Sequence, residues 1–147
     1  MKLKELGEFG LIERLQRGCL VRPEGVVRAI GDDAAVFETA GGQVTLLTTD
    51  LLIERVHFLR QAVSGEDLGH KALAVNLSDI AAMGAEPREA FVSIAVPPDC
   101  SIAFLEEIYN GMRILAGRHQ VNILGGDTTT SRRDLVINVA VTGRADP

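Results

Sequence analysis

The stretch LLTTDLLIERVHF, from Leu46 to Phe58, decides how the rest of this chain is interpreted. Together with Val44 and Thr45, its β-branched and apolar residues predict a strand that ends in an acid, Asp50, and a second apolar run begins directly after it. A carboxylate at the end of a buried strand is costly unless a cation, a basic side chain or backbone amides compensate its charge. Asp50 is therefore the first candidate for a functional residue.

The segments on both sides of this stretch predict helices and further strands. Helical periodicity is present in GEFGLIERLQRG (7–18), EDLGHKALAVNLSDIAAM (66–83) and SIAFLEEIYNGMRILAGRH (101–119). Strands are predicted for AIGDDAAVFE (29–38) and VTLLTTD (44–50), which the turn GGQ joins into a hairpin, and for REAFVSIAVP (88–97), VNILGGD (121–127) and DLVINVAVTG (134–143). The last strand is expected to be buried on both faces. The pattern indicates a single α/β domain.

The composition excludes several classes of protein. The 147 residues include 20 acidic and 15 basic side chains, a net charge of −5, without a block of Lys and Arg. We therefore expect neither nucleic acid nor an anionic membrane as a partner. The two cysteines, Cys19 and Cys100, lack the spacing of a zinc site or a disulfide framework. The N-terminal segment carries charges throughout and no long apolar core, which predicts a soluble, cytoplasmic protein.

Acidic residues recur where the apolar segments stop or turn, and one more lies within the predicted 66–83 helix. If these positions converge, mutual repulsion would raise the pKa values of the carboxyl groups unless cations intervene. Mg²⁺ is the natural cation, because it prefers oxygen ligands and is held by one or two carboxylates plus water and substrate phosphates. The hydroxyls of Thr48 and Thr49 can add oxygens, and the glycines of LGGDTTTS let backbone amides approach a phosphate. The acids are Asp32, Asp33, Asp50, Asp79 and Asp127.

Each of these signals also has a purely structural interpretation. GDD and GGD are as typical of turns as of sites when they stand alone. Asp79 is compatible with an acid on the exposed side of a helix, although its neighbours Leu77 and Ile80 indicate little solvated surface. His57 is compatible with a packed, hydrogen-bonded histidine, and Tyr109, the single tyrosine, with a core residue. The functional interpretation therefore depends on the combination.

Five motifs resemble, in the same order, those of the thiamine-monophosphate kinases, a family of the aminoimidazole-ribotide-synthetase-like superfamily. They are GEFGLIERL, IGDDAAV, TTDLLIERVHF, HKALAVNLSDIAAMGAEP and LGGDTT, and the resemblance covers nearly the whole chain. It implies ATP-dependent phosphorylation of thiamine monophosphate to thiamine diphosphate, with several Mg²⁺ ions as cofactors. Because the accepting phosphate oxygen is already ionised at neutral pH, no side chain is predicted to act as a general base.

The resemblance also implies roles for particular residues. His57 is the implied substrate-binding residue, and Arg55, which stands where relatives commonly carry glycine or another small residue, is expected at the substrate entrance. The basic residue that usually follows GGDTT is displaced towards Arg132 and Arg133. The implied magnesium ligands are Asp33, Thr48, Thr49, Asp50, Asp79 and Asp127. The implied nucleotide contacts are Tyr109, Asn110, Gly126 and Asp127.

The architecture that the resemblance implies is an α/β domain of the α+β type. It has a mostly antiparallel sheet, helices on one face, and a homodimer whose two sheets form a barrel across the interface. Because family members have two domains, residues 1–147 are expected to be the N-terminal domain for ATP and magnesium binding and for dimerisation, with the C-terminal domain absent. Two alternatives stay open: a sibling ATP-using enzyme of the ribotide synthetase, selenophosphate synthetase or hydrogenase-maturation type, or a non-enzymatic dimerising metal-binding domain.

Overall fold

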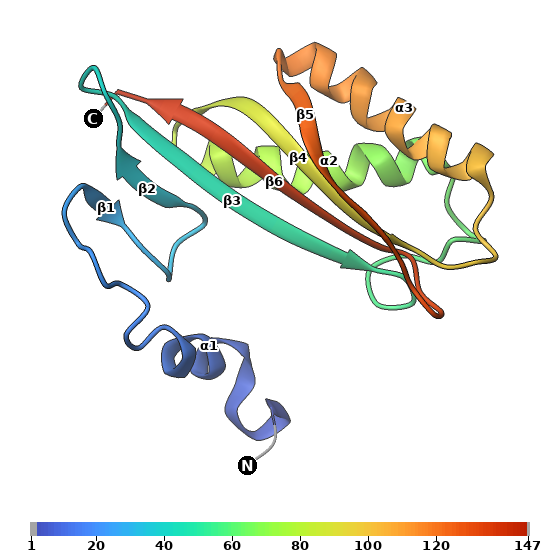
Figure 1. Ribbon diagram of the computed structural model, residues 1–147, viewed down its shortest axis with the longest axis horizontal. Coiled ribbons are helices and arrows are strands. Elements are labelled where there is room, and N and C mark those ends of the chain that lie inside the picture. Colours follow the sequence, from blue (N-terminus) through green and yellow to red (C-terminus); the bar gives the residue numbers. More distant parts are fainter. Residues whose placement is uncertain (1–2, 147) are drawn as a thin grey trace.

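Helices and strands alternate along residues 3–146, which the computed structural model describes. Helix α1 (Leu3–Leu15) precedes three strands, β1 (Val26–Arg28), β2 (Ala35–Glu38) and β3 (Val44–Ile53). Helix α2 (Gly65–Ala82), β4 (Glu86–Val96), α3 (Ile102–His119), β5 (Asn122–Thr130) and β6 (Val136–Ala145) follow (Figure 1). The three predicted helices and the hairpin of β2 and β3 are confirmed.

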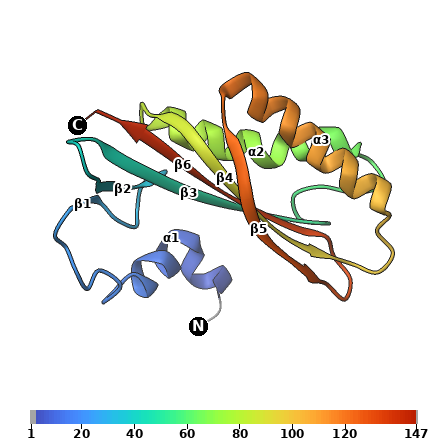
Figure 2. The ribbon, with the colours of Figure 1, turned by 45° about the horizontal axis from the view of Figure 1, so that its top comes forward.

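The six strands form one sheet in the order β1-β2-β3-β6-β4-β5. Neighbouring strands are antiparallel except β4 and β5, which are parallel. Helices α2 and α3 lie on one face of the sheet, whereas α1 stands apart from it (Figures 1 and 2). The predicted mostly antiparallel sheet with helices on one face is therefore confirmed. Among the described helices, none combines the length and the apolar character that crossing a membrane requires.

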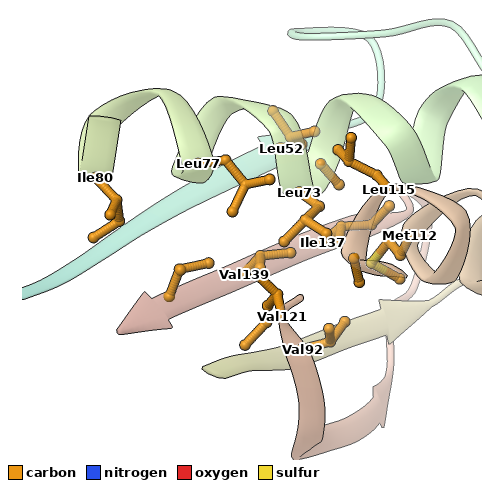
Figure 3. Packing of buried hydrophobic residues seen from close by; sticks show 14 of the residues in the cluster. Leu52, Leu73, Leu77, Ile80, Val92, Met112, Leu115, Val121, Ile137 and Val139 are labelled. Atoms are coloured by element: carbon orange, nitrogen blue, oxygen red, sulfur yellow. The ribbon is translucent and has the colours of Figure 1, made fainter. Parts of the chain in front are cut away.

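The hydrophobic core fills the space between the sheet and helices α2 and α3 (Figure 3). Leu73 and Ile80 of α2 are buried, at 1% and 0% exposure, against strand residues such as Ile137 and Val139 of β6. Full burial of one such side chain stabilises a fold by about 1.5–3 kcal/mol. The core thereby fixes α2 over β3 and β6, which sets the position of every side chain on the sheet-facing side of α2.

Glycines allow helices α2 and α3 to approach each other closely. A Cβ atom at Gly69 would lie 1.8 Å from the carbonyl oxygen of Ile108, and one at Gly111 would lie 2.0 Å from the carbonyl oxygen of Glu66. Real Cβ atoms do not come this close to backbone, so a larger residue at either position would push the helices apart. The N-terminal half of α2 is therefore held by α3, and its C-terminal half lies over β3.

Two strands run further than their sequences predict. Strand β3 continues through Asp50 to Ile53 because it pairs with β6, and β5 continues through Asp127 to Thr130 beside β4. The prediction that strands end at Asp50 and Asp127 is wrong, since both residues lie inside longer strands. Pairing with a neighbouring strand decided this, and local sequence does not show such pairing. Strand β6 is not buried on both faces either, because buried and half-exposed residues alternate along it.

Candidate functional site

Thr48 and Asp79 form the centre of the candidate site. Thr48 lies on the helix-covered side of β3, where 6% of its surface is exposed, and its hydroxyl donates a hydrogen bond to Oδ2 of Asp79 at 3.0 Å. Asp79 lies in the last turn of α2, directly before the fully buried Ile80. The half-buried position of Asp79 contradicts the alternative of an acid on the exposed side of a helix.

Negative charge gathers around Asp79. Burial raises the pKa of its carboxyl group, and the carboxylates of Asp50 and Asp33 raise this pKa further, whereas the Thr48 hydrogen bond lowers it. Asp50 and Asp33 therefore lie near enough to Asp79 to influence its carboxyl group. A cation bound among them would offset both the burial of Asp79 and the repulsion between the carboxylates.

Thr49 points away from this group, because successive side chains of a strand alternate between the two faces of the sheet. Its hydroxyl oxygen accepts a hydrogen bond from Nδ2 of Asn138 at 2.8 Å. The same nitrogen donates to the main-chain oxygen of Asp50 at 2.9 Å. Thr49 thus belongs to the face of the sheet that α2 and α3 do not cover, which we call the open face.

Asp127 does not join the acids around Asp79. It lies on the edge strand β5, and strands β6 and β4 separate β5 from β3. Three steps of about 4.8 Å between neighbouring strands put the two backbones roughly 14 Å apart. The register pairs Asp127 with Ser93, and Ser93 with Asn138, so Asp127 belongs to a row on the open face. The predicted convergence of all the acids in one region is wrong for Asp127, because strand order is a tertiary property.

Gly126 is required by the packing of β5 against β4. Its φ of 151° lies in the region that favours glycine, and a Cβ atom there would lie 1.7 Å from the carbonyl oxygen of Val92. The glycine therefore has a structural reason as well as the predicted role at a phosphate. Gly126 and Asp127 are both exposed, so the backbone of this segment is open to a ligand.

Tyr109 and Asn110 lie on different sides of α3. Tyr109 is half-buried beside Ile123 and borders an open cavity of about 540 Å³, and burial raises the pKa of its hydroxyl. Asn110 faces α2, where its Nδ2 donates to Oε1 of Glu66 at 2.6 Å. Tyr109 packs against the core, as the structural interpretation predicts, and it also borders the cavity, so a role at the nucleotide stays a prediction.

The residues 54–60, which we call the His57 turn, follow β3 directly. Arg55 is exposed, forms an ion pair with Asp134, and has a φ of 65°, in the left-handed region that favours glycine. This backbone conformation gives a physical reason for the small residue that the family resemblance implies at this position. His57 is exposed, which excludes the alternative of a packed core histidine.

Sequence reasoning assigned no role to Glu54 and Arg60 in this turn. Glu54 is 2% exposed and is paired with Arg60, whose guanidinium also contacts Asp99; the bond to Asp99 is the main reason that the pKa of Arg60 lies above its usual value. The sequence did contain a signal for the burial of Glu54, because it continues the series of every second residue, after Asp50 and Leu52, that faces the helices.

The donor set around Asp79 fits Mg²⁺, because all of its atoms are carboxylate or hydroxyl oxygens. Within residues 3–146, no three side chains of His, Cys, Asp and Glu lie close enough to hold a metal ion by themselves. Magnesium in nucleotide enzymes is usually held by one or two carboxylates, with water and phosphate oxygens at the other positions. A magnesium ion at this position would need water and phosphate oxygens to complete its coordination.

The fold agrees with the match of the chain to a known family. Residues 31–145 match the model of the family described as AIR synthase related protein, N-terminal domain. The chain belongs to this family.

Two curated relatives and one solved structure are similar over almost the whole chain. Thiamine-monophosphate kinase of Bacillus subtilis is 38% identical over 96% of the chain, and thiamine-monophosphate kinase of Aquifex aeolicus is 37% identical over 99%. The structure described as "AaThiL complexed with AMPPCP and TMP" is 36% identical over 99% of the chain, with a TM-score of 0.88. The chain covers 43%, 45% and 44% of these proteins, respectively, so it spans less than half of their length.

Proposed function

We propose that this chain is the ATP- and magnesium-binding N-terminal part of an enzyme that phosphorylates thiamine monophosphate to thiamine diphosphate. The observation that carries the proposal is the similarity, over 99% of the chain, to a protein solved together with AMPPCP and TMP. The acidic group around Asp79 supports it independently, because transfer between two phosphates requires that their negative charge be neutralised.

The reaction needs positioning more than it needs acid–base chemistry. The acceptor is an ionised phosphate oxygen, so no residue has to remove a proton. Asp33, Asp50 and Asp79, with the Thr48 hydroxyl, are the proposed ligands on the helix-covered face; Thr49 and Asp127 are proposed ligands on the open face. Magnesium ions held there would neutralise charge on both substrates and fix them for in-line attack.

The proposed nucleotide contacts follow the edge of the sheet. Tyr109 borders the cavity beside β5, and Gly126 and Asp127 lie further along the same strand. A base at Tyr109 and phosphates at Gly126 would lie along one strand edge. Asn110 would contribute to nucleotide binding only indirectly in this arrangement, since its side chain already donates a hydrogen bond to Glu66.

We also propose that two copies of this chain form a dimer through the open face. Leu47, Leu51 and Phe91 of this face are 40–48% exposed, and Phe91 lies opposite Ala140 of β6. A second copy would bury these side chains, as the predicted barrel across the interface requires. Residues 1–147 then serve as the dimerisation domain, and a cytoplasmic location without nucleic-acid partners stays a prediction.

Product analysis tests the proposed function. The natural protein at its full encoded length is incubated with ATP, Mg²⁺ and thiamine monophosphate, and thiamine diphosphate and ADP are measured. We expect equimolar products that disappear when Mg²⁺ is removed. ADP released only with an acceptor of the sibling families would replace the kinase by a sibling enzyme, and the absence of any ATP binding would favour a non-enzymatic domain. The 147-residue chain alone is expected to bind Mg²⁺ and ATP with little turnover, because more than half of the relatives' length lies outside it.

A further inference from the structure

A buried ion pair closes the base of the His57 turn. Glu54 begins the turn and is 2% exposed, and Nε of Arg60, at the end of the turn, donates to Oε1 of Glu54 at 3.2 Å. Oε2 of Glu54 accepts the backbone N–H of Leu135 at 2.9 Å, and the backbone N–H of Glu54 donates to the carbonyl oxygen of Leu135 at 3.0 Å. The base of the turn is therefore fixed to the segment between β5 and β6.

Two other segments also hold the turn. Nη2 of Arg60 donates to Oδ2 of Asp99, between β4 and α3, at 2.8 Å. Nζ of Lys71 in α2 donates to the main-chain carbonyl oxygen of His57 at 2.7 Å. Val56 and His57, at the tip, are nevertheless exposed. An exposed polar side chain on a base held from three sides is the arrangement of a pre-organised binding group.

Stability alone does not explain this ion pair. A carboxylate loses its hydration when it is buried, and apolar residues of similar volume often give equal or greater stability at such positions. Glu54 and Arg60 instead fix the orientation of the turn, because their charge-assisted hydrogen bonds hold its two ends relative to Leu135 and Asp99.

The turn also fixes the imidazole ring of His57. The backbone N–H of Ile53 donates to Nδ1 of His57 at 3.0 Å, and the backbone N–H of His57 donates back to the carbonyl oxygen of Ile53 at 2.9 Å. A backbone N–H only donates, so Nδ1 is the acceptor and the neutral ring carries its proton on Nε2. His57 therefore presents one hydrogen-bond donor in a fixed direction.

We propose that Glu54 and Arg60 are positioning residues that hold His57 so that its Nε2–H donates to an acceptor atom of the phosphorylated substrate. The proposal depends on the function proposed above, for which the substrate is thiamine monophosphate. Side chains that neither touch the substrate nor carry a predicted role would then set its affinity. We expect the effect to be specific to this substrate, because strands β6 and β4 separate β3, which the turn follows, from the β5 edge proposed for ATP.

The tautomer of His57 tests the positioning without any substrate. The chain has three histidines, and the signals of His57 in a ¹⁵N-labelled sample are assigned from their loss in His57→Gln. We expect a pure Nε2–H tautomer in the wild-type chain and a mixture of tautomers in Glu54→Gln. Glu86→Gln is the matched control, since Glu86 forms an exposed pair with Arg88 at 3.1 Å, and it should leave the spectrum unchanged. Mixed tautomers in the wild type, or a pure tautomer in Glu54→Gln, would overturn the proposal.

Binding measurements on the natural protein at its full length test the link to the substrate. We expect Glu54→Gln and His57→Gln each to raise the Kd for thiamine monophosphate about tenfold, with the Kd for ATP in Mg²⁺ changed less than about twofold. The double variant should be no weaker than His57→Gln, because both changes remove one interaction. Additive effects of the two changes, or an equal loss of ATP affinity, would show that the ion pair has only a structural role.

Arg60→Lys, which keeps the charge but not the two-sided contact, replaces Glu54→Gln if that variant does not fold. No binding of thiamine monophosphate by the wild type would refute the proposed function, and the tautomer experiment would still decide the positioning.

Discussion

The two faces of the sheet carry neighbouring residues of the same strands in different surroundings. On the helix-covered face, Leu46, Leu52 and Val92 are at most 5% exposed. On the open face, their sequence neighbours Leu47, Leu51 and Phe91 are 40–48% exposed. Both rows are apolar, so the difference lies in the cover that α2 and α3 provide and not in the strands themselves. An apolar row without a cover indicates a surface for a partner.

The candidate site follows the same division. Thr48, Asp50 and Asp79 lie between the sheet and α2, in a part of the molecule that is held by the core. Thr49 and Asp127 lie on the open face, where the chain itself provides little surrounding structure. One half of the proposed site is therefore held in place within a single chain, whereas the other half would need a ligand or a second copy to surround it.

The largest expected effect comes from breaking the helix cover. Gly69→Ala places a Cβ atom 1.8 Å from the carbonyl oxygen of Ile108, and we expect the free energy of unfolding in urea to fall by about 3 kcal/mol. Gly117→Ala in α3 is the control, because nothing lies within 4 Å of the new atom, and it should raise stability by roughly 0.5–1 kcal/mol. Equal stabilities of the two variants would contradict the close packing of α2 against α3.

The next effect separates the two halves of the site. Asp50→Asn should weaken Mg²⁺-dependent ATP binding by roughly 10- to 100-fold and leave the melting temperature without ligand unchanged or higher, because repulsion on Asp79 falls. Asp127→Asn should weaken ATP binding without changing the melting temperature, since Asp127 is exposed. Calorimetry measures both the ATP affinity and the melting temperature. Asp32→Asn is the control, as Asp32 is paired with Arg28 at 2.6 Å. Unchanged ATP affinity with a large fall in melting temperature would make Asp50 structural.

The smallest effect concerns the open face. Phe91→Lys should raise the dissociation constant of the proposed dimer about tenfold, measured by light scattering over a range of protein concentrations. Ile102→Lys makes the same change at a 70% exposed position that begins α3, and it should leave the constant unchanged. A chain that stays monomeric at all concentrations, or a dimer that tolerates Phe91→Lys, would remove the open face from the interface.

The sequence predicted the elements of this fold because each has a local signal. Ser64 and Ser101 cap α2 and α3 by accepting the N–H groups of Asp67 and Phe104, and the apolar periodicity of both helices is visible without a structure. The strands were found by their β-branched residues, but their ends were not. Asp50 is polar in isolation, yet pairing with Val139 keeps it within β3.

What the sequence determined by itself is the family to which its motifs point and the list of candidate residues: the proposed oxygen ligands, the glycines and His57. Tertiary structure alone decided how this list is divided. Strand order placed two strands between Asp50 and Asp127, and the alternation of β3 put Thr48 and Thr49 on opposite faces. The tertiary structure also buried Glu54 beside Arg60 at the base of the His57 turn. The physical reason is that composition and periodicity act over a few residues, whereas these contacts join segments that only the packing of the sheet brings together.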